Sequence, residues 1–291
     1  MRVAATWSAV GAQSGSDAFM TCANVATGGV TVALVIDVER EYSPSSLVGG
    51  TAAPFVADYQ QRSAVVRRSL SAMIESRAGG TLLLPAMHRS APLLVFIHGG
   101  YWQALSAADS MYLAPAVHHL GWSYAAIEYT LAPAATIEVM VTEVREALAD
   151  LASVGSQRVV VVGHSAGAHL AAMTCLAHEP PMSIDTVALI SGVFDLRPLL
   201  STTVNDAVRL DEARATALSP QLLSVAGRAR VVVTCGEIET DEFKRQSRDY
   251  TAHLRAHGLS TRGLESTGRH HFDIVDDVVA ADTPLGAAVL G

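Results

Sequence analysis

The sequence predicts an α/β fold in which a mostly parallel central sheet is covered by helices on both faces. From Thr81 onward, short runs of β-branched and aliphatic residues alternate with longer Ala-rich segments that have helical spacing. Strands of a parallel sheet are buried on both faces, so they read as continuous apolar runs. Half of the 291 residues are hydrophobic and only 16% are charged, which is enough apolar material for one large core.

Strands and helices are expected in alternating order. Strands are predicted at residues 81–84, 93–97, 124–127, 158–162, 187–190 and 230–234. Helices are predicted at residues 110–120, 137–153, 166–177 and 242–257. The stretch 192–228 has no regular pattern, and we expect it to form loops or at most a small cap near the site.

The chain is expected to divide into an N-terminal extension of unknown role, residues 1–38, and a single domain, residues 39–291. The extension is rich in Ala, Gly, Ser and Thr and has little periodic pattern, apart from one candidate strand at residues 30–36. Its apolar stretch at residues 3–10 is too short and interrupted for a secretory signal. A single α/β domain of this length is common, so no further division is predicted.

Composition argues against several classes of partner. The net charge is −8 and the Lys and Arg residues form no stripe, so a nucleic-acid surface is not expected. No apolar run reaches the roughly 18 residues that a membrane helix needs. Cys22, Cys175 and Cys235 are odd in number and far apart, which favours a reducing compartment. We therefore expect a cytoplasmic protein, and a homodimer is one hypothesis for its assembly.

Residues 163–167 read G-H-S-A-G, directly after a predicted strand and before a predicted helix. A sharp turn between strand and helix admits only small residues two positions either side of the serine. Such a turn lifts the side chain of Ser165 out of the sheet and places it at a helix N-terminus, where a developing anion is favoured. This context is typical of serine hydrolases with the α/β-hydrolase fold, so Ser165 is the predicted nucleophile.

The segment H-G-G-Y-W at residues 98–102 directly follows the predicted strand at 93–97, well upstream of Ser165. Acyl transfer forms an oxyanion that needs preorganised N–H donors, and glycines let a loop turn its amides toward the substrate. We predict an oxyanion hole from the amides of Gly100, Tyr101 and Ala166, with Gly99 allowing the turn. The side chains of Tyr101, Trp102 and His164 are expected to line the substrate pocket.

The base and the acid should follow the nucleophile in the order acid, then histidine. His270 and His271 lie in a late loop, and His271 is the preferred base with His270 as the alternative. Glu237, Glu239 and Asp241 all follow the late strand. Loop chemistry alone does not choose between them, although aspartate is the commoner acid. Asp195 is a weaker alternative, because it is expected to anchor its own loop.

Several segments resemble the serine-hydrolase type of kynurenine formamidase (arylformamidase). They are EREYSPSS at 39–46, HGGYWQ at 98–103, GHSAGAHLAAM at 163–173, SGVFDLRPL at 191–199, GEIETDEFKRQS at 236–247 and HHFDIVDD at 270–277. The resemblance covers about residues 39–280. Aligned on it, the family's catalytic aspartate falls on Glu239, a departure from the family pattern. The resemblance therefore implies a triad of Ser165, Glu239 and His271, with Asp241 as the second choice of acid.

The resemblance implies hydrolysis of N-formyl-L-kynurenine to L-kynurenine and formate, with no cofactor. One alternative is a carboxylesterase or amidase that acts on another small acyl aromatic, because fold and triad do not fix the substrate. Another is a non-catalytic binding protein that reuses a hydrolase pocket. No metal site is predicted: His164 and His169 are five residues apart rather than four, and no HExxH motif is present.

Overall fold

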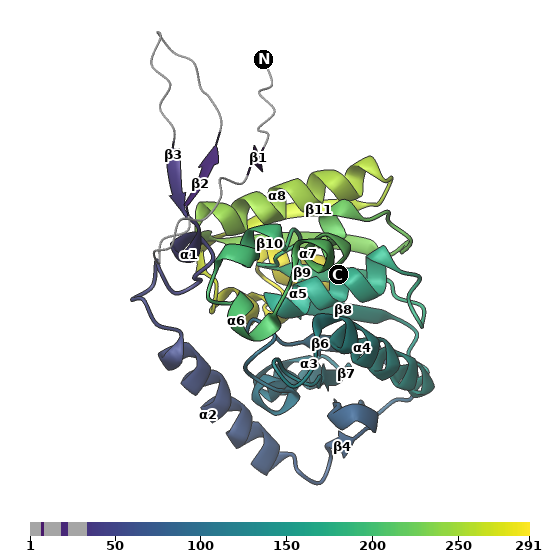
Figure 1. Cartoon of the computed structure of the whole chain (residues 1–291). Coiled ribbons are helices and arrows are strands. Elements are labelled where there is room, and N and C mark those ends of the chain that lie inside the picture. Colours follow the sequence, from purple (N-terminus) through teal and green to yellow (C-terminus); the bar gives the residue numbers. More distant parts are fainter. Residues whose placement is uncertain (1–6, 9–18, 23–33) are drawn as a thin grey trace.

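The computed structural model describes residues 7–8, 19–22 and 34–291 of the chain (Figure 1). Its main feature is an eight-stranded sheet in the order β11-β10-β9-β8-β6-β7-β5-β4. The run from β11 to β7 is parallel, and β5 and β4 add an antiparallel edge. The predicted α/β class with a mostly parallel sheet is therefore confirmed.

The strands of this sheet differ in length and burial. They are β4 (Glu75–Ser76), β5 (Leu82–Leu84), β6 (Leu93–Ile97), β7 (Ser123–Ile127), β8 (Val159–His164), β9 (Thr186–Ile190), β10 (Arg230–Ile238) and β11 (Thr261–His270). Every residue of β6 to β9 is buried. Because the long central strands are parallel, their carboxyl ends meet at one edge of the sheet, where α/β proteins place their sites.

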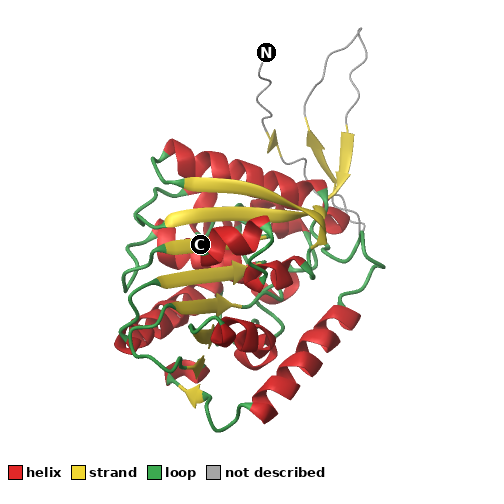
Figure 2. Ribbon diagram, turned by 180° about the vertical axis from the view of Figure 1, so that it is seen from behind, coloured by secondary structure: helices red, strands yellow, loops and turns green. Residues whose placement is uncertain are grey.

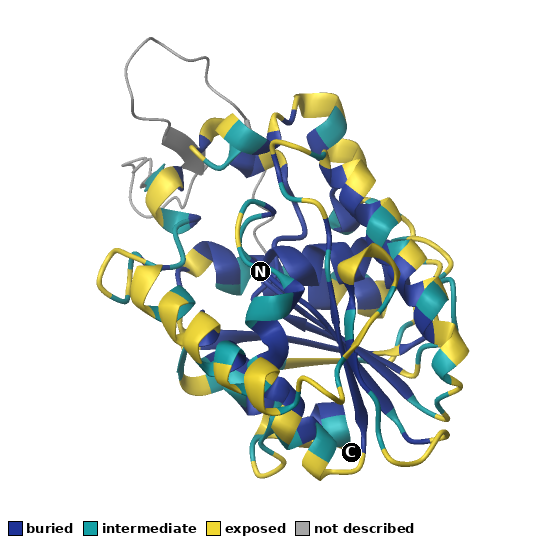
Figure 3. Ribbon diagram, turned by 90° about the horizontal axis from the view of Figure 1, so that it is seen from below, coloured by how far each residue is buried: buried dark blue, intermediate teal, exposed yellow. Residues whose placement is uncertain are grey.

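Helices cover both faces, and the alternation of side chains along each strand divides the core in two. One cluster joins Leu93, Val95 and Ile97 of β6 to α4 (Ile137–Leu151), α5 (Ala166–Ala172) and α8 (Asp241–Ala256). The other joins Leu94 and Phe96 to α3 (Ala114–His119), α9 (Pro284–Leu290) and the 3₁₀ segments η2 (Ala107–Leu113) and η7 (Ile274–Val279). Figure 3 shows the buried sheet between helices whose outer surfaces are exposed.

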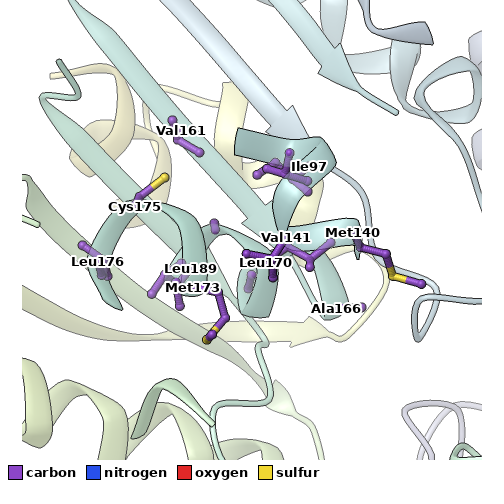
Figure 4. Packing of buried hydrophobic residues seen from close by; sticks show 14 of the residues in the cluster. Ile97, Met140, Val141, Val161, Ala166, Leu170, Met173, Cys175, Leu176 and Leu189 are labelled. Carbon is purple, nitrogen blue, oxygen red and sulfur yellow. The ribbon is translucent and has the colours of Figure 1, made fainter. Parts of the chain in front are cut away.

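The helix after the nucleophile turn is buried along its whole length. All seven residues of α5 are buried, and a π-helical turn, η4 (Met173–Ala177), continues it. Figure 4 shows Leu170, Met173 and Leu176 in one cluster with side chains from the sheet and from α4. The segment thus forms a rigid support directly behind Ser165.

All six predicted strands and all four predicted helices are present, with shifted ends. Strand β10 extends past the predicted residue 234 to Ile238, because it pairs with β11. Strand β11 was not predicted: as an edge strand with charged residues such as Arg262 and Glu265, it has no apolar run. Helix α2 (Ala53–Ser69) was not predicted either. Tyr59 and Ser63 are the two residues that it buries, which is too few to produce an apolar pattern with helical spacing.

The irregular stretch 192–228 contains short helices packed against the domain. They are η5 (Arg197–Ser201), α6 (Asn205–Val208), α7 (Glu212–Ala217) and η6 (Pro220–Leu222). Leu199, Val208 and Ala215 are buried in the core cluster that contains α5. The stretch therefore agrees with the expectation of loops or a small cap. Two further 3₁₀ turns are η1 (Ala78–Gly80) and η3 (Ala152–Val154).

Near the N-terminus, β1 (Trp7–Ser8), β2 (Phe19–Cys22) and β3 (Leu34–Asp37) form a separate antiparallel sheet. Figure 2 shows its strands apart from those of the main sheet. Strand β3 covers the end of the candidate strand at 30–36, and residues 30–33 lie outside the described residues. The next element, α1 (Val38–Glu41), buries Val38 in the core of the main domain. In the described part of the chain, no helix has the length and hydropathy to cross a membrane.

Candidate active site

Ser165 lies in the turn between β8 and α5, with φ 54° and ψ −119°. This conformation is strained for a residue with a side chain and costs about 1–3 kcal/mol. The turn is also tight: a Cβ atom at Gly163 would lie 2.3 Å from the Gly167 carbonyl oxygen, and one at Gly167 would lie 2.0 Å from the Ile97 carbonyl oxygen. The glycines are therefore needed for close backbone approach, and the strained turn presents Ser165 at the carboxyl edge of the sheet.

The loop after β6 runs directly against this turn. A Cβ atom at Gly99 would lie 2.9 Å from Cβ of Ser165. Gly100 has φ 95°, and the next two residues, Tyr101 (φ 49°) and Trp102 (φ 60°), also have positive φ. Only glycine adopts such angles without strain, so this loop is held in its shape by the surrounding structure.

The predicted oxyanion donors are available in this arrangement. Among the turn, loop and cap hydrogen bonds of the described residues, none uses the amides of Gly100, Tyr101 or Ala166 as a donor. The carbonyl oxygens of His98 and Gly99 instead accept the hydroxyl of Tyr129, at 3.0 and 3.2 Å. The loop is thus anchored through its carbonyl groups, which leaves its amides free to bind an anion.

The late histidine and one acidic residue form a buried pair. His271 Nδ1 lies 2.9 Å from Glu239 Oε2, and the two residues are 1% and 4% exposed. Glu239 Oε1 also accepts the Ser191 hydroxyl and the Gly236 amide, each at 2.6 Å. A carboxylate accepts hydrogen bonds, so this contact favours a proton on Nδ1 of His271 and a free lone pair on Nε2.

The structure separates the other acid candidates from His271. Asp241 is an exposed residue at the start of α8, and Glu237 is exposed and accepts the Gly268 amide at 2.7 Å. Asp195 binds Arg197 through both carboxylate oxygens. Of the acid candidates, Glu239 is thus the one found against the His271 ring.

The alternative base, His270, is turned away from this pair. Its Nδ1 accepts the amide of Phe272 at 3.1 Å, and its ring contacts Phe55 edge-on. It follows that Glu239 and His271 are brought together while Asp241 and His270 lie elsewhere.

His164 and His169 lie behind the site as buried neutral rings. His164 Nε2 donates to the His271 carbonyl oxygen at 2.8 Å, and burial, followed by the charge of His271, lowers the pKa of His164 to about 3. Burial also lowers the pKa of His169 to about 4, and its Nε2 donates to the Leu218 carbonyl at 2.7 Å. His164 therefore fixes the backbone of the base without carrying charge.

Two of the side chains predicted to line the substrate pocket are buried. Trp102 is 0% exposed and packs edge-on against His169, with ring centroids 5.2 Å apart. His164 is also buried. Trp102 thus packs against α5, and the assignment of Trp102 and His164 to the pocket stays a prediction. Tyr101 is partly exposed, and its hydroxyl donates to the Tyr42 carbonyl at 2.5 Å.

Helix α2 contacts the loop that contains His271, and sequence reasoning missed this contact. The Tyr59 hydroxyl donates to the Phe272 carbonyl, and the rings of Phe55 and Phe272 stack with centroids 4.4 Å apart. Arg62 binds Asp276 at 2.8 Å. These contacts join residues more than 200 positions apart, so no local pattern could have indicated them.

Gln246 is a second residue that sequence reasoning missed. Its Oε1 accepts the amides of Phe194 and Asp195, both at 2.9 Å, and its Nε2 donates to the Tyr42 hydroxyl and the Asp195 carbonyl. This buried amide joins α8 to the loop after β9 and to the segment after α1. Its place in the resembling segment 236–247 was the one available signal.

A cavity of about 280 Å³ lies beside this network. It is lined by Ile36, Val38, Tyr42, Asp195, Arg197, Pro198, Leu200, Glu212, Glu242 and Arg245. Ser165, Glu239 and His271 do not line it, so its volume says nothing about the substrate. Among the described residues, no three His, Cys, Asp or Glu side chains are gathered so that they could hold a metal ion.

Solved structures support the fold. The chain superposes on a structure from Silicibacter sp. with a TM-score of 0.79 and 25% identity, over 88% of this chain and 100% of that one. An esterase from the archaeon Pyrobaculum calidifontis gives a TM-score of 0.61 at 18% identity, over 82% and 94% of the two chains. At this identity the esterase shows only a shared α/β-hydrolase fold.

Sequence comparisons identify the family. A family model described as BD-FAE matches residues 81–209. The chain is 34% identical to the kynurenine formamidase of Salmo salar over 215 residues, which is 68% of this chain and 72% of that protein. It is 33% identical to the kynurenine formamidase of Danio rerio, over 65% and 68% of the two chains. The chain is therefore a hydrolase that belongs to the kynurenine formamidase family.

Proposed function

We propose that this protein hydrolyses N-formyl-L-kynurenine to L-kynurenine and formate, with Ser165, His271 and Glu239 as its catalytic triad. The observation that carries the proposal is the buried pair of Glu239 and His271 in a family member whose strained serine turn lies at the same edge of the sheet. A serine needs such an oriented base to become a nucleophile at neutral pH.

In the first half of the reaction, the Ser165 hydroxyl oxygen attacks the formyl carbon. His271 Nε2 takes the hydroxyl proton, while Nδ1 donates to Glu239, 2.9 Å away. The negative charge that forms on the formyl oxygen is bound by the amides of Gly100, Tyr101 and Ala166. The carboxylate stabilises the imidazolium without accepting its proton.

The C–N bond then breaks, and His271 gives its proton to the departing arylamine nitrogen, so kynurenine leaves. A water molecule attacks the formyl-serine and transfers a proton to His271, and formate is released as Ser165 regains its hydrogen. An arylamine is expelled more easily than an alkylamine, since the ring delocalises its lone pair. A serine triad is therefore sufficient, and no cofactor is part of the proposal.

A second candidate function is hydrolysis of an ester or amide of another small acyl aromatic. The observation that favours it is the 28% identity to esterase LipQ of Mycobacterium tuberculosis, over 65% of this chain. The same triad would carry out this reaction, because the fold and the triad do not select the leaving group. The two functions differ in the substrate and not in the chemistry at Ser165.

The test is release of formate and kynurenine from N-formyl-L-kynurenine by the wild type and by Ser165→Ala. We expect turnover in the wild type and a loss of about 10⁴-fold or more in the variant. Ser71→Ala, at an exposed serine after α2, is the matched control and should keep full activity. A wild type that cleaves a simple aryl ester but not the formamide would favour the second function, and an active Ser165→Ala would refute the triad.

The cellular setting is also proposed. Cys175 and Cys235 are free and buried, which supports a reducing compartment such as the cytoplasm. The net charge of −8 argues against a nucleic-acid partner. A homodimer stays a prediction, and light scattering of the purified protein would test it.

A further inference from the structure

The carboxylate of Glu239 makes hydrogen bonds to three residues, which lie in or directly after three neighbouring strands. Ser191 follows the last residue of β9, Gly236 lies in β10, and His271 follows the last residue of β11. Two of these bonds, from the Ser191 hydroxyl and the Gly236 amide, end on the same oxygen, Oε1. The other oxygen, Oε2, is thereby left to face His271.

The side chain of a glutamate needs more contacts than that of an aspartate to be held in one orientation at this position. Its side chain has one more rotatable bond, so more rotamers must be excluded before one oxygen faces the imidazole. Hydrogen bonds to an ionised carboxylate are short and strong, and both bonds on Oε1 measure 2.6 Å. The Gly236 amide is part of the backbone, whereas the Ser191 hydroxyl depends on the choice of side chain.

The backbone conformation of Ser191 also indicates that its side chain is needed. Ser191 has φ 51°, a conformation that glycine adopts more readily, and it is 0% exposed. Its amide donates to the Thr234 carbonyl, and the residue before it, Ile190, accepts the Ser165 amide, both at 2.8 Å. Glycine would relieve the strain at this position but would lack the hydroxyl. A serine at a strained position therefore suggests that its side chain makes a contact that the protein needs.

We infer that Ser191 is a positioning residue of the triad: its hydroxyl fixes the carboxylate of Glu239 so that Oε2 holds His271. The inference rests on the proposed triad. Ser191 does not touch the substrate, and it acts through Glu239 alone. Because its amide contacts β10 and the Ile190 carbonyl next to it accepts the Ser165 amide, Ser191 lies where the two halves of the site meet.

The test compares Ser191→Ala with Ser191→Gly. Both remove the hydroxyl, but glycine also relieves the backbone strain, so Ser191→Gly should be more stable than Ser191→Ala. If the hydroxyl positions Glu239, both variants should lose about 10- to 100-fold in kcat, with KM changed less than about twofold. Thr251→Val, which removes another buried and hydrogen-bonded hydroxyl, should change stability and leave kcat unchanged.

The rate of Ser165 labelling by a fluorophosphonate gives a readout that does not depend on the substrate. It should fall by a similar factor in Ser191→Ala and Ser191→Gly. Glu239→Asp is the last arm: the shorter acid no longer reaches the hydroxyl in the same way, so Ser191→Ala should cost much less in that background. Such non-additivity is not expected of a residue that only fills the core.

The outcomes separate this inference from the proposed function. Labelling in the wild type, with unchanged rates in both Ser191 variants, would overturn the role of Ser191 and leave the triad intact. Loss of labelling in Ser191→Ala but not in Ser191→Gly would also overturn it, because the hydroxyl would then serve only to stabilise the strained backbone. A wild type that is never labelled would overturn the triad, and the inference with it.

Discussion

The turn at Ser165 is shaped by close approach of its own backbone, whereas Glu239 and His271 are held mainly by segments far away in the sequence. On the nucleophile side, Gly163 and Gly167 allow contacts that any side chain would block. On the acid–base side, the partners come from α2, from the residue after β9 and from the residue before Ser165. The two halves of one site thus depend on different kinds of interaction.

The difference shows what each half can tolerate. A turn built on close backbone approach fails when one glycine gains a methyl group, because the backbone atoms in its path have nowhere to move. A pair held by hydrogen bonds and ring contacts loses its partners one at a time, so its activity should decline in steps. Substitutions on the two sides should therefore differ in whether folding or catalysis is lost first.

On the acid–base side, the largest effect on catalysis is expected from Glu239→Gln. The amide keeps the shape of the side chain but removes the charge that orients and stabilises His271, so kcat/KM should fall about 10³- to 10⁴-fold. Asp241→Asn, two residues along and exposed, is the matched control and should stay within about twofold of the wild type. Steady-state hydrolysis of an aryl ester measures both. A large loss in Asp241→Asn with an active Glu239→Gln would reverse the assignment of the acid.

On the nucleophile side, Gly163→Ala should act on folding. Its Cβ would lie 2.3 Å from the Gly167 carbonyl oxygen and 2.6 Å from Cα of Ala168. We expect the free energy of unfolding, measured in urea, to fall by about 3–5 kcal/mol, or the protein to be insoluble. Gly258→Ala is the control: φ is also positive there, but no atom lies within 4 Å of the added Cβ. It should cost about 1–2 kcal/mol, and equal costs at the two positions would contradict the packing argument.

A smaller effect is expected from Phe55→Ala, which removes the ring stacked on Phe272. The residue after the base would lose a contact worth about 1 kcal/mol, so kcat/KM should fall about 5- to 10-fold while the sheet stays folded. Val65→Ala changes an exposed residue on the same helix, 53% exposed, and should leave kcat/KM unchanged. Unaltered kinetics in Phe55→Ala would show that α2 is not needed to hold the histidine loop.

The difference between the nucleophile side and the acid–base side also explains what the sequence could predict. The strand, the turn residues and the helix around Ser165 are contiguous, so a local pattern contains the whole feature. Glu239 could be selected over Asp241 only through the family resemblance, because the choice depends on the alignment of β10 with β11 and on Ser191. Helix α2 has two buried residues and strand β11 is an edge strand, so neither has the apolar periodicity that indicates an element.

Helix α2 also bears on how this enzyme would respond to heat. It buries few residues of its own, and segments of that kind open at lower free energy than the core strands do. When it detaches, the Phe272 carbonyl loses the Tyr59 hydroxyl and Asp276 loses Arg62, yet the eight-stranded sheet keeps its ladder. Thermal inactivation should therefore begin below the melting temperature of the domain and should be reversed on cooling. The working temperature of such an enzyme would be set by one surface helix and not by its core.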